Sequence, residues 1–393
     1  MTDSPNGTTD DATEAGEPAV LTGARAIIEL GALAANWRAH AGVAAGAECG
    51  AVLKADAYGI GLVPAGRTLW NVGARTFFVA LGEEGRRLRE ALPEATIFVL
   101  NGATADDLPF LYRHRLAPFL SSAEEIYEIA AAARAAGREL PVAINVDTGM
   151  NRLGIALERA ESWIAEGLPE GISPLMVASH LACGDDPAHP MNAAQLGRFS
   201  FLAATVRRRW PDVKLSLANS AGILMGPEYH FDLARPGIAL YGARAIADRP
   251  PLRLVVTLEA RILQVRAVAA GETVGYGAAQ TMRRDGRVAI ASIGYADGFP
   301  RAAGGSDGSP GATVMVGRTR CPLIGRVSMD LIAIDVTDCP PGGVARGAWV
   351  EIFGEAIPVD EAAAAAGTIG YEFLANLSRR APRVYIPPRP SGS

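Results

Sequence analysis

The chain has 393 residues, of which 49% are hydrophobic and 20% are charged. This composition provides for a large buried core, and it excludes a disordered chain or a small binding module. The net charge of -5 and the lack of a basic block disfavour a nucleic-acid partner, and no run of about 18 apolar residues predicts a membrane span.

Residues 1–24 are polar and acidic, with no apolar segment of the kind found in signal peptides. We interpret them as a disordered N-terminal tail and expect a cytoplasmic protein. The four cysteines have no CxxC spacing and are interpreted as reduced thiols. The five histidines lack the spacing of metal ligands, so no metal site is predicted.

From residue 48 to 247, short apolar runs alternate with helical patterns, which is typical of βα units around a parallel sheet. The predicted strands are 50–54, 76–81, 96–100, 117–120, 142–146, 175–179, 214–218 and 232–235. Ala-rich stretches such as 123–136 and 193–209 predict helices between them. Eight such units predict a (β/α)8 TIM-type barrel over residues 25–250.

Reactive side chains follow the predicted strand ends, where the βα loops of a barrel build its active site. They include Lys54, Asn101, Ser121, Arg152, His180, Asn219, Ser220, Arg235 and Gly237. For Asn101 and Ser121 we favour a role in a turn or a cap.

The chain has two lysines, Lys54 and Lys214, among 37 basic residues. A lysine amine can lose its proton and attack a carbonyl, which a guanidinium cannot do. Lys214 is interpreted as a surface charge. Lys54 ends an apolar run and is a candidate nucleophile, although a lysine without function at a strand end is an equal alternative at this point.

After about residue 250 the pattern changes to β-type runs separated by Gly/Pro turns, at 253–265, 288–293, 313–316, 332–336 and 349–353. Helical patterns appear at 357–366 and 371–377. Residues 251–393 therefore predict a second, mostly antiparallel β domain. The glycine-rich stretch 304–311 is interpreted as a flexible surface loop with no catalytic role.

Short motifs occur in order along both parts: AVLKADAYG (51–59), VDTGMNRLG (146–154), ANSA (218–221), RPGIALYG (235–242), GYGA (275–278), GYADG (294–298), GRVSMD (325–330) and GYE (370–372). Together they resemble the alanine racemases, pyridoxal-phosphate enzymes with a barrel followed by a β domain. The similarity extends from about residue 26 to 385.

The resemblance implies that Lys54 carries the cofactor and is the base on one face of the substrate. Tyr276 matches the family's second base, which reaches the opposite face from the neighbouring subunit. A tyrosine acts as a base only where positive neighbours stabilise its phenolate. We expect Arg235 and His180 to be those neighbours.

The resemblance also assigns the cofactor contacts. Arg235 faces the pyridine nitrogen, to which it donates a hydrogen bond without transferring a proton. The cofactor phosphate is expected to be bound by backbone amides and hydroxyls that follow the seventh and eighth strands. The cofactor-binding set is Lys54, Tyr58, His180, Asn219, Ser220, Arg235, Gly237, Ile238 and Tyr371.

Substrate contacts are implied for four further positions. Arg152 lies near the substrate carboxylate, and Met329 with Asp330 matches a loop that enters the partner's site. Tyr295 resembles a gate at a narrow entrance, and a small pocket behind it would favour alanine.

The chain departs from the family pattern at two positions. Asn145 replaces a lysine that many members carry and that is thought to be carbamylated, so we expect a bound chloride beside Asn145 and Arg152. Ile60 replaces a histidine and so removes a polar group, and we make no prediction of what this does to rate or specificity.

The resemblance therefore implies racemisation of alanine by a homodimer that supplies D-alanine for peptidoglycan. Alternatives of the same architecture are a racemase of broader specificity and an amino-acid decarboxylase, which would place an acidic residue at the ring nitrogen. A non-catalytic pyridoxal-phosphate carrier would need only the barrel.

Overall fold

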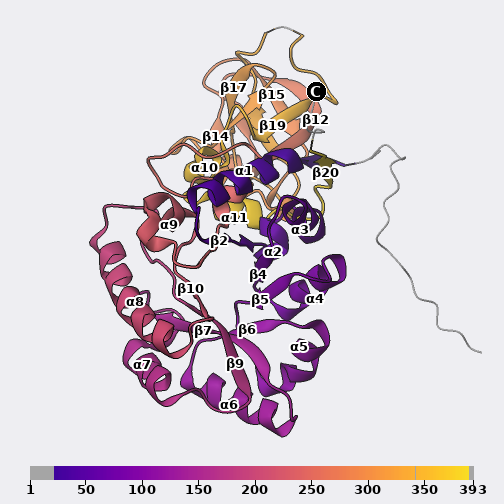
Figure 1. Cartoon of the computed structure of the whole chain (residues 1–393). Helices are drawn as coiled ribbons and strands as arrows, with labels where there is room; N and C mark the ends of the chain where they lie inside the picture. The colour runs from indigo at the N-terminus through magenta and orange to yellow at the C-terminus, as the bar shows by residue number, and fades with distance from the viewer. Residues whose placement is uncertain (1–21, 341, 389–393) are drawn as a thin grey trace, which may run out of the picture.

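The computed structural model describes residues 22–340 and 342–388. The predicted tail, residues 1–24, lies outside the described residues except for its last three. The chain forms a barrel followed by a β domain. In Figure 1 the barrel is the lower part of the molecule and the β domain is the upper part. Within the described ranges, no helix has the length and apolar composition needed to span a bilayer.

Parallel strands form a closed ring in the barrel. Pairing runs in the order β3-β4-β5-β6-β7-β9-β10. The last strand, β11, pairs in parallel with β2 and is joined to the β10 side by hydrogen bonds from Asp232 N to Leu215 O and from Arg235 N to Ala218 O. The strands are β2 (Glu48–Cys49), β3 (Ala51–Val52), β4 (Thr76–Val79), β5 (Thr96–Val99), β6 (Ala117–Leu120), β7 (Leu140–Asp147), β8 (Ile155–Ala156), β9 (Ile172–Ala178), β10 (Lys214–Ser216) and β11 (Leu233–Ala234).

Helices cover the outside of this ring. Every residue of β4 and of β6 is buried, as expected for parallel strands that are covered on both faces. Helix α1 precedes β2, the first strand of the barrel, and packs against α3 and α9. It therefore occupies the place of the helix that would follow the last barrel strand. The barrel helices are α1 (Leu30–Val43), α3 (Leu62–Asn71), α4 (Gly82–Ala91), α5 (Leu108–His114), α6 (Ala123–Ala135), α7 (Leu157–Glu166), α8 (Pro190–Arg209) and α9 (Ser220–Met225). The element α2 (Lys54–Tyr58) is a left-handed turn after β3 rather than a right-handed helix.

The β domain is built on the long strand β12, which pairs antiparallel with β1, β15 and β19. The main sheet has the order β17-β16-β19-β12-β1-β20, with β15 and β18 alongside. Its strands are β1 (Ala24–Glu29), β12 (Val256–Val268), β13 (Thr273–Val274), β14 (Gln280–Thr281), β15 (Gly286–Ala291), β16 (Thr313–Val316), β17 (Thr319–Pro322), β18 (Ile332–Asp335), β19 (Trp349–Phe353) and β20 (Arg383–Ile386). The predicted fold class is confirmed.

Strand β1 belongs to this second sheet, although the sequence analysis assigned residues from 25 onward to the barrel. Ala24, Ala26 and Ile28 are buried and their neighbours are half-buried, which is the alternation of an antiparallel strand with one covered face. Strand β1 lies between β12 and β20, so residues from both ends of the described chain complete one sheet.

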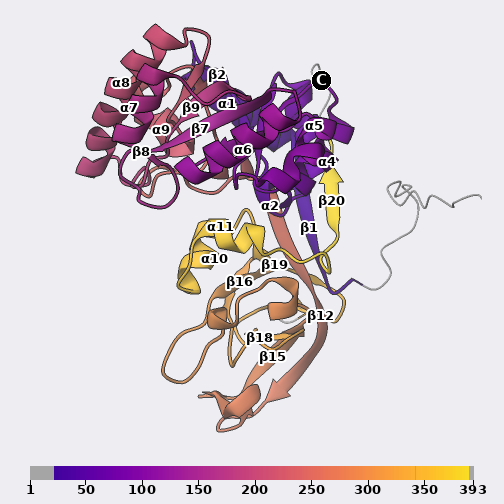
Figure 2. The same ribbon diagram turned by 90° about the horizontal axis from the view of Figure 1, so that it is seen from below.

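Two short helices, α10 (Val359–Ala365) and α11 (Gly370–Ala375), lie between the barrel and the β sheet, as Figure 2 shows. Helix α11 packs against α2, the turn that begins at Lys54. The β domain therefore contributes residues to the carboxyl end of the barrel, where the active site of this fold is built.

Candidate active site

A cavity of about 530 Å³ lies at the carboxyl ends of the barrel strands. It is lined by predicted site residues from strands far apart in the chain: Lys54, Tyr58, Arg152, His180, Asn219, Ser220, Arg235, Gly237, Ile238 and Tyr371. Asn145 lines the same cavity. The strand-end criterion had selected seven of these ten residues, whereas Tyr58, Ile238 and Tyr371 came from the family resemblance.

Lys54 opens a left-handed turn, which ends the predicted strand 50–54 early. Ala55, Asp56, Ala57 and Tyr58 all have φ between 52° and 56°. Each non-glycine residue in this region costs about 1–2 kcal/mol, so contacts from elsewhere must stabilise the turn.

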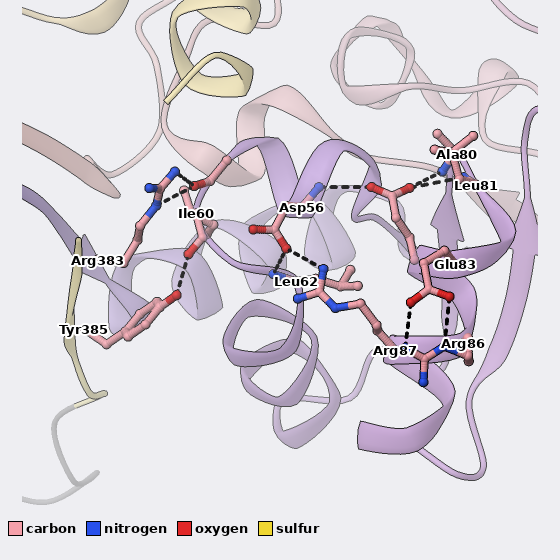
Figure 3. A network of polar contacts seen from close by, with 12 residues as sticks. Asp56, Ile60, Leu62, Ala80, Leu81, Glu83, Arg86, Arg87, Arg383 and Tyr385 are labelled. Carbon is pink, nitrogen blue, oxygen red and sulfur yellow. Dashed lines mark hydrogen bonds and ion pairs between the residues drawn. The ribbon is translucent and has the colours of Figure 1, made fainter. Parts of the chain in front are cut away.

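Glu84, at the start of α4, holds the first half of the turn. Its Oε1 accepts a hydrogen bond from Asp56 N at 3.0 Å, and its Oε2 accepts from Ala80 N at 2.8 Å and Leu81 N at 3.2 Å. The Asp56 side chain in turn accepts from Leu62 N at 3.0 Å. Figure 3 shows these contacts around Asp56.

The β domain holds the second half of the turn. Arg383 donates from Nε and Nη2 to Gly59 O at 2.9 and 2.6 Å, and Tyr385 Oη donates to Ile60 O at 2.9 Å (Figure 3). At Gly59, where φ is 81°, an added Cβ would lie 2.1 Å from Leu374 O. The Ile60 side chain is fully buried in the core, where a histidine would need polar partners.

Lys54 is a suitable nucleophile because its pKa is lowered, so its amine loses a proton more easily than an ordinary lysine does. The side chain is open to the cavity, but surrounding protein atoms lower its pKa by desolvation, and the positive charge of Arg152 lowers it further. The carboxylate of Glu84 opposes this shift. Glu84 therefore affects Lys54 in two ways: it holds the turn that follows Lys54, and its charge raises the pKa of Lys54.

Arg235 is almost completely buried, at 5% exposure. Its Nη2 donates to Ser179 O at 2.6 Å and its Nη1 donates to Ser216 Oγ. Burial lowers its pKa to about 10, so Arg235 remains charged at neutral pH.

His180 does not supply the positive charge expected of it. Burial, followed by the charges of Arg235, Arg152 and Lys54, lowers its pKa to about 3. The imidazole is therefore neutral at neutral pH, and the prediction that it stabilises a phenolate as a cation is wrong. The sequence does not reveal how many cations the fold places around this ring.

Backbone amides and hydroxyls form an anion cradle at the end of β11. Ser220 Oγ accepts from Gly237 N at 2.8 Å, and Asn219 caps α9 through Gly222 N at 3.0 Å. At Gly237 an added Cβ would lie 2.6 Å from Tyr58 Oη, so a larger residue would block the cradle. Burial raises the pKa of Tyr58, and it raises that of Tyr371 to about 12, so both phenols stay protonated and can donate hydrogen bonds.

These residues fit pyridoxal phosphate. The cavity offers an amine for its aldehyde, a buried cationic donor for its ring nitrogen, and hydroxyl and amide donors for its phosphate. Asn145 Nδ2 donates to Ser121 Oγ at 3.1 Å, which fixes the amide beside the same cavity as Arg152.

Four predicted site residues lie outside this cavity. Tyr276, Met329 and Tyr295 are on the surface of the β domain, with exposures of 72%, 53% and 45%. Asp330 is also exposed and pairs with Arg380 at 2.7 Å. Within one chain the two predicted bases are therefore apart: Lys54 lines the cavity, and Tyr276 does not.

Sequence reasoning missed Glu84 and Ser216. Glu84 follows the end of β4 by a few residues, so the strand-end criterion could have found it. Ser216 is the last residue of β10, but the predicted strand 214–218 placed it inside the strand, so the strand-end criterion did not select it.

A lysine with a lowered pKa, a buried arginine and an anion cradle at the carboxyl ends of a (β/α)8 barrel define a pyridoxal-phosphate enzyme of the barrel class. Two family profiles match the chain: "Alanine racemase, N-terminal domain" over residues 28–245 and "Alanine racemase, C-terminal domain" over residues 255–385. The chain belongs to the alanine racemase family, and the predicted resemblance is confirmed.

Known relatives cover almost the whole chain. An alanine racemase of Methylobacterium sp. (strain 4-46) is 48% identical over 365 residues, which are 93% of this chain and 98% of the relative. The biosynthetic alanine racemase of Agrobacterium fabrum is 45% identical over 386 residues, 96% of each chain. The catabolic enzyme of the same organism is 42% identical over 364 residues, 92% of each.

Solved structures agree with the fold. The alanine racemase from Bartonella henselae, which holds covalently bound pyridoxal phosphate, has a TM-score of 0.86 at 38% identity and covers 93% of this chain and 100% of that one. The biosynthetic alanine racemase from Pseudomonas aeruginosa has a TM-score of 0.83 at 36% identity, with the same coverage of both chains.

Proposed function

We propose that this chain interconverts L-alanine and D-alanine by a two-base mechanism, with Lys54 on one face of the substrate and Tyr276 of the partner subunit on the other. The observation that carries the proposal is the separation of the two bases. Lys54 lines the cavity, whereas Tyr276 is 72% exposed on the β domain of the same chain. An active site with both bases then needs two chains.

Pyridoxal phosphate, when bound, supplies an electron sink for the pair left on the α carbon after the C–H bond breaks. Lys54 would hold this cofactor, and its amine is the base on one face of the substrate: the neutral Nζ accepts the α proton, and the ammonium form that results returns a proton to that face. The lowered pKa of Lys54 favours the neutral form that this step requires.

Arg235 donates to the ring nitrogen while keeping its own proton, because its pKa of about 10 is well above neutral pH. Its bonds to Ser179 O and Ser216 Oγ hold the guanidinium in place. A decarboxylase of this fold would be expected to use an acidic residue here, so Arg235 favours racemisation.

Ser220, Gly237 and Ile238 bind the cofactor phosphate, and the protonated phenols of Tyr58 and Tyr371 complete its set of donors. Asn219 and His180 line the same cavity, and His180 acts there as a neutral hydrogen-bonding group.

Arg152 binds the substrate carboxylate, and a chloride ion occupies the space between Asn145 and Arg152. A neutral amide cannot provide the negative charge of a carbamate, and Arg152 leaves a positive charge to be balanced there. Crystals soaked in bromide are expected to show an anomalous peak beside Asn145. A water molecule at that position in a well-ordered map would refute the chloride.

The partner subunit contributes Met329 and Asp330 near the carboxylate and Tyr295 at the entrance. The exposure of these groups together with Tyr276 on one domain supports a homodimer with shared sites. A narrow entrance limits the substrate to a small side chain, whereas a broader racemase would need a wider one.

Subunit exchange tests this proposal. A chain with Lys54→Ala and a chain with Tyr276→Phe are each expected to be inactive as homodimers. Mixed in equal amounts and allowed to exchange, they form one intact site per heterodimer, which predicts about one quarter of wild-type activity for a two-fold symmetric dimer. Heterodimers verified by mass that remain inactive would overturn the shared site.

The role in D-alanine supply for peptidoglycan is a further part of the proposal. Relatives of both biosynthetic and catabolic types match the chain, with identities of 45% and 42%. Deletion of the gene is expected to make growth depend on added D-alanine. Growth without D-alanine in a strain with no other racemase would argue for a catabolic role.

A further inference from the structure

The glycine-rich loop, residues 304–311, is attached to the segment that follows Tyr276. Within this loop, Asp307 N donates to Ala279 O at 2.9 Å. The Asp307 carboxylate accepts from Thr281 N at 2.9 Å, from Thr281 Oγ1 at 2.7 Å and from Gln280 Nε2 at 3.2 Å. One aspartate thus binds three consecutive residues beside the predicted second base.

The segment that carries Tyr276 has little support of its own. Tyr276 begins a single 3-10 turn, Tyr276–Ala278, in which Gly277 and Ala278 have φ of 70° and 45°. The flanking strands β13 and β14 have two residues each and pair with one another. A hairpin this short is marginally stable by itself, so its geometry depends on outside contacts.

The same loop also contacts the segment that leads to Met329. Gly305 N donates to Gly325 O at 3.0 Å. An added Cβ at Gly304 would lie 2.8 Å from Val327 N, and one at Gly325 would lie 2.8 Å from Val274 O. The loop therefore joins the two segments whose side chains are proposed to reach the partner's site.

We infer that Asp307 is a positioning residue for Tyr276: it fixes the 276–281 segment so that the phenol reaches the partner's active site at a defined place and angle. This inference rests on the proposed function of Tyr276. It replaces the interpretation of residues 304–311 as a flexible loop with no catalytic role, because that pattern of Gly and Ser did not reveal the contacts of Asp307.

The test compares Asp307→Ala and Asp307→Asn with a matched control, Asp285→Ala. Asp285 is an exposed aspartate of the same domain that accepts a single backbone hydrogen bond, from Ala270 N at 2.8 Å. Loss of Asp307 is expected to lower kcat roughly 10- to 100-fold, with little change in KM, because misplacement of a reacting group by about 1 Å has this effect. Asp307→Asn keeps one acceptor oxygen, so its kcat is expected to lie between those of Asp307→Ala and the wild type. The kcat of Asp285→Ala is expected to equal that of the wild type.

Isotope effects separate positioning from a general loss of structure. With α-deuterated alanine, a misplaced Tyr276 makes its own proton transfer more rate-limiting. The deuterium effect on kcat/KM is then expected to rise for the enantiomer whose proton Tyr276 removes and to fall for the other. Amide hydrogen exchange at Thr281 N is expected to be faster in both Asp307 variants, and this measurement does not depend on catalytic activity.

The outcomes distinguish this inference from the proposed function. If Tyr276→Phe abolishes activity while Asp307→Ala keeps wild-type kcat and isotope effects, the positioning role is overturned and the two-base proposal stands. If Tyr276→Phe remains fully active, both fall. A drop in kcat with unchanged isotope effects in Asp307→Ala and Asp307→Asn, as from fewer folded dimers, would also overturn the positioning role.

Discussion

The guanidinium of Arg235 donates to the backbone carbonyl of Ser179 at 2.6 Å, which joins the end of β11 to the end of β9 across the floor of the cavity. Ser216 Oγ, from β10 between them, accepts a second hydrogen bond from Arg235. A buried cation is thus held by two neighbouring strands before any cofactor binds.

Ser216→Ala is expected to destabilise the protein by about 1–3 kcal/mol, because it leaves a buried N–H of Arg235 without an acceptor. The melting temperature of the apoenzyme measures this effect. Ser162→Ala is the control, since Ser162 is on the surface of α7 and bonds only to Glu166 in the described chain. Equal melting temperatures for the two variants would contradict the role of Ser216.

Lys54→Arg is expected to abolish racemisation and the covalent attachment of pyridoxal phosphate, because a guanidinium does not form the bond that an amine forms. Mass spectrometry after borohydride reduction measures the attachment. The chain provides its own control in Lys214, an exposed lysine paired with Glu48, and Lys214→Arg is expected to retain wild-type activity. Attached cofactor in Lys54→Arg would contradict the assignment.

The pKa of Lys54 is expected to shift in opposite directions when its two charged neighbours are neutralised. Glu84 raises this pKa, so Glu84→Gln lowers it further and moves the onset of amine reactivity to lower pH. Arg152 lowers it, so Arg152→Gln moves the onset to higher pH. The rate at which an acylating reagent labels Lys54 in the apoenzyme, followed from pH 5 to 10, checks both signs. Shifts in the same direction would contradict this electrostatic account.

Gly59→Ala tests the close packing of the left-handed turn. The new Cβ would lie 2.1 Å from Leu374 O, so the backbone must move in addition to the cost of a positive φ. Gly46 also has a positive φ, 99°, but an added Cβ meets nothing within 4 Å. Gly46→Ala is expected to cost about 1–3 kcal/mol from φ alone, whereas Gly59→Ala costs more and also releases the cofactor. Thermal melting and cofactor content distinguish the two.

The sequence predicts several strands of both domains well, because these strands are short apolar runs between helices or turns. The ranges 117–120, 313–316 and 349–353 coincide with β6, β16 and β19. Lys54 could be identified because lysine is rare in this chain. These features depend on local composition, which a sequence displays directly.

Other features depend on contacts between distant segments, and the sequence does not display them. The left-handed turn after Lys54 contains Ala, Asp, Ala and Tyr, of which only Asp adopts a positive φ with any frequency. It is stabilised by Glu84 and Arg383 from elsewhere in the chain. Burial, which sets the neutral state of His180, also follows from the whole fold. The same is true of β1, whose partners β12 and β20 lie more than 200 residues away.

The pairing of β1 with β20, and the grip of Arg383 and Tyr385 on the segment after Lys54, have a consequence for biosynthesis. The barrel residues leave the ribosome long before β20 does, so a nascent barrel carries its amine on a segment that is not yet held. The segment after Lys54 is therefore fixed only once β20 has been synthesised and has docked beside β1.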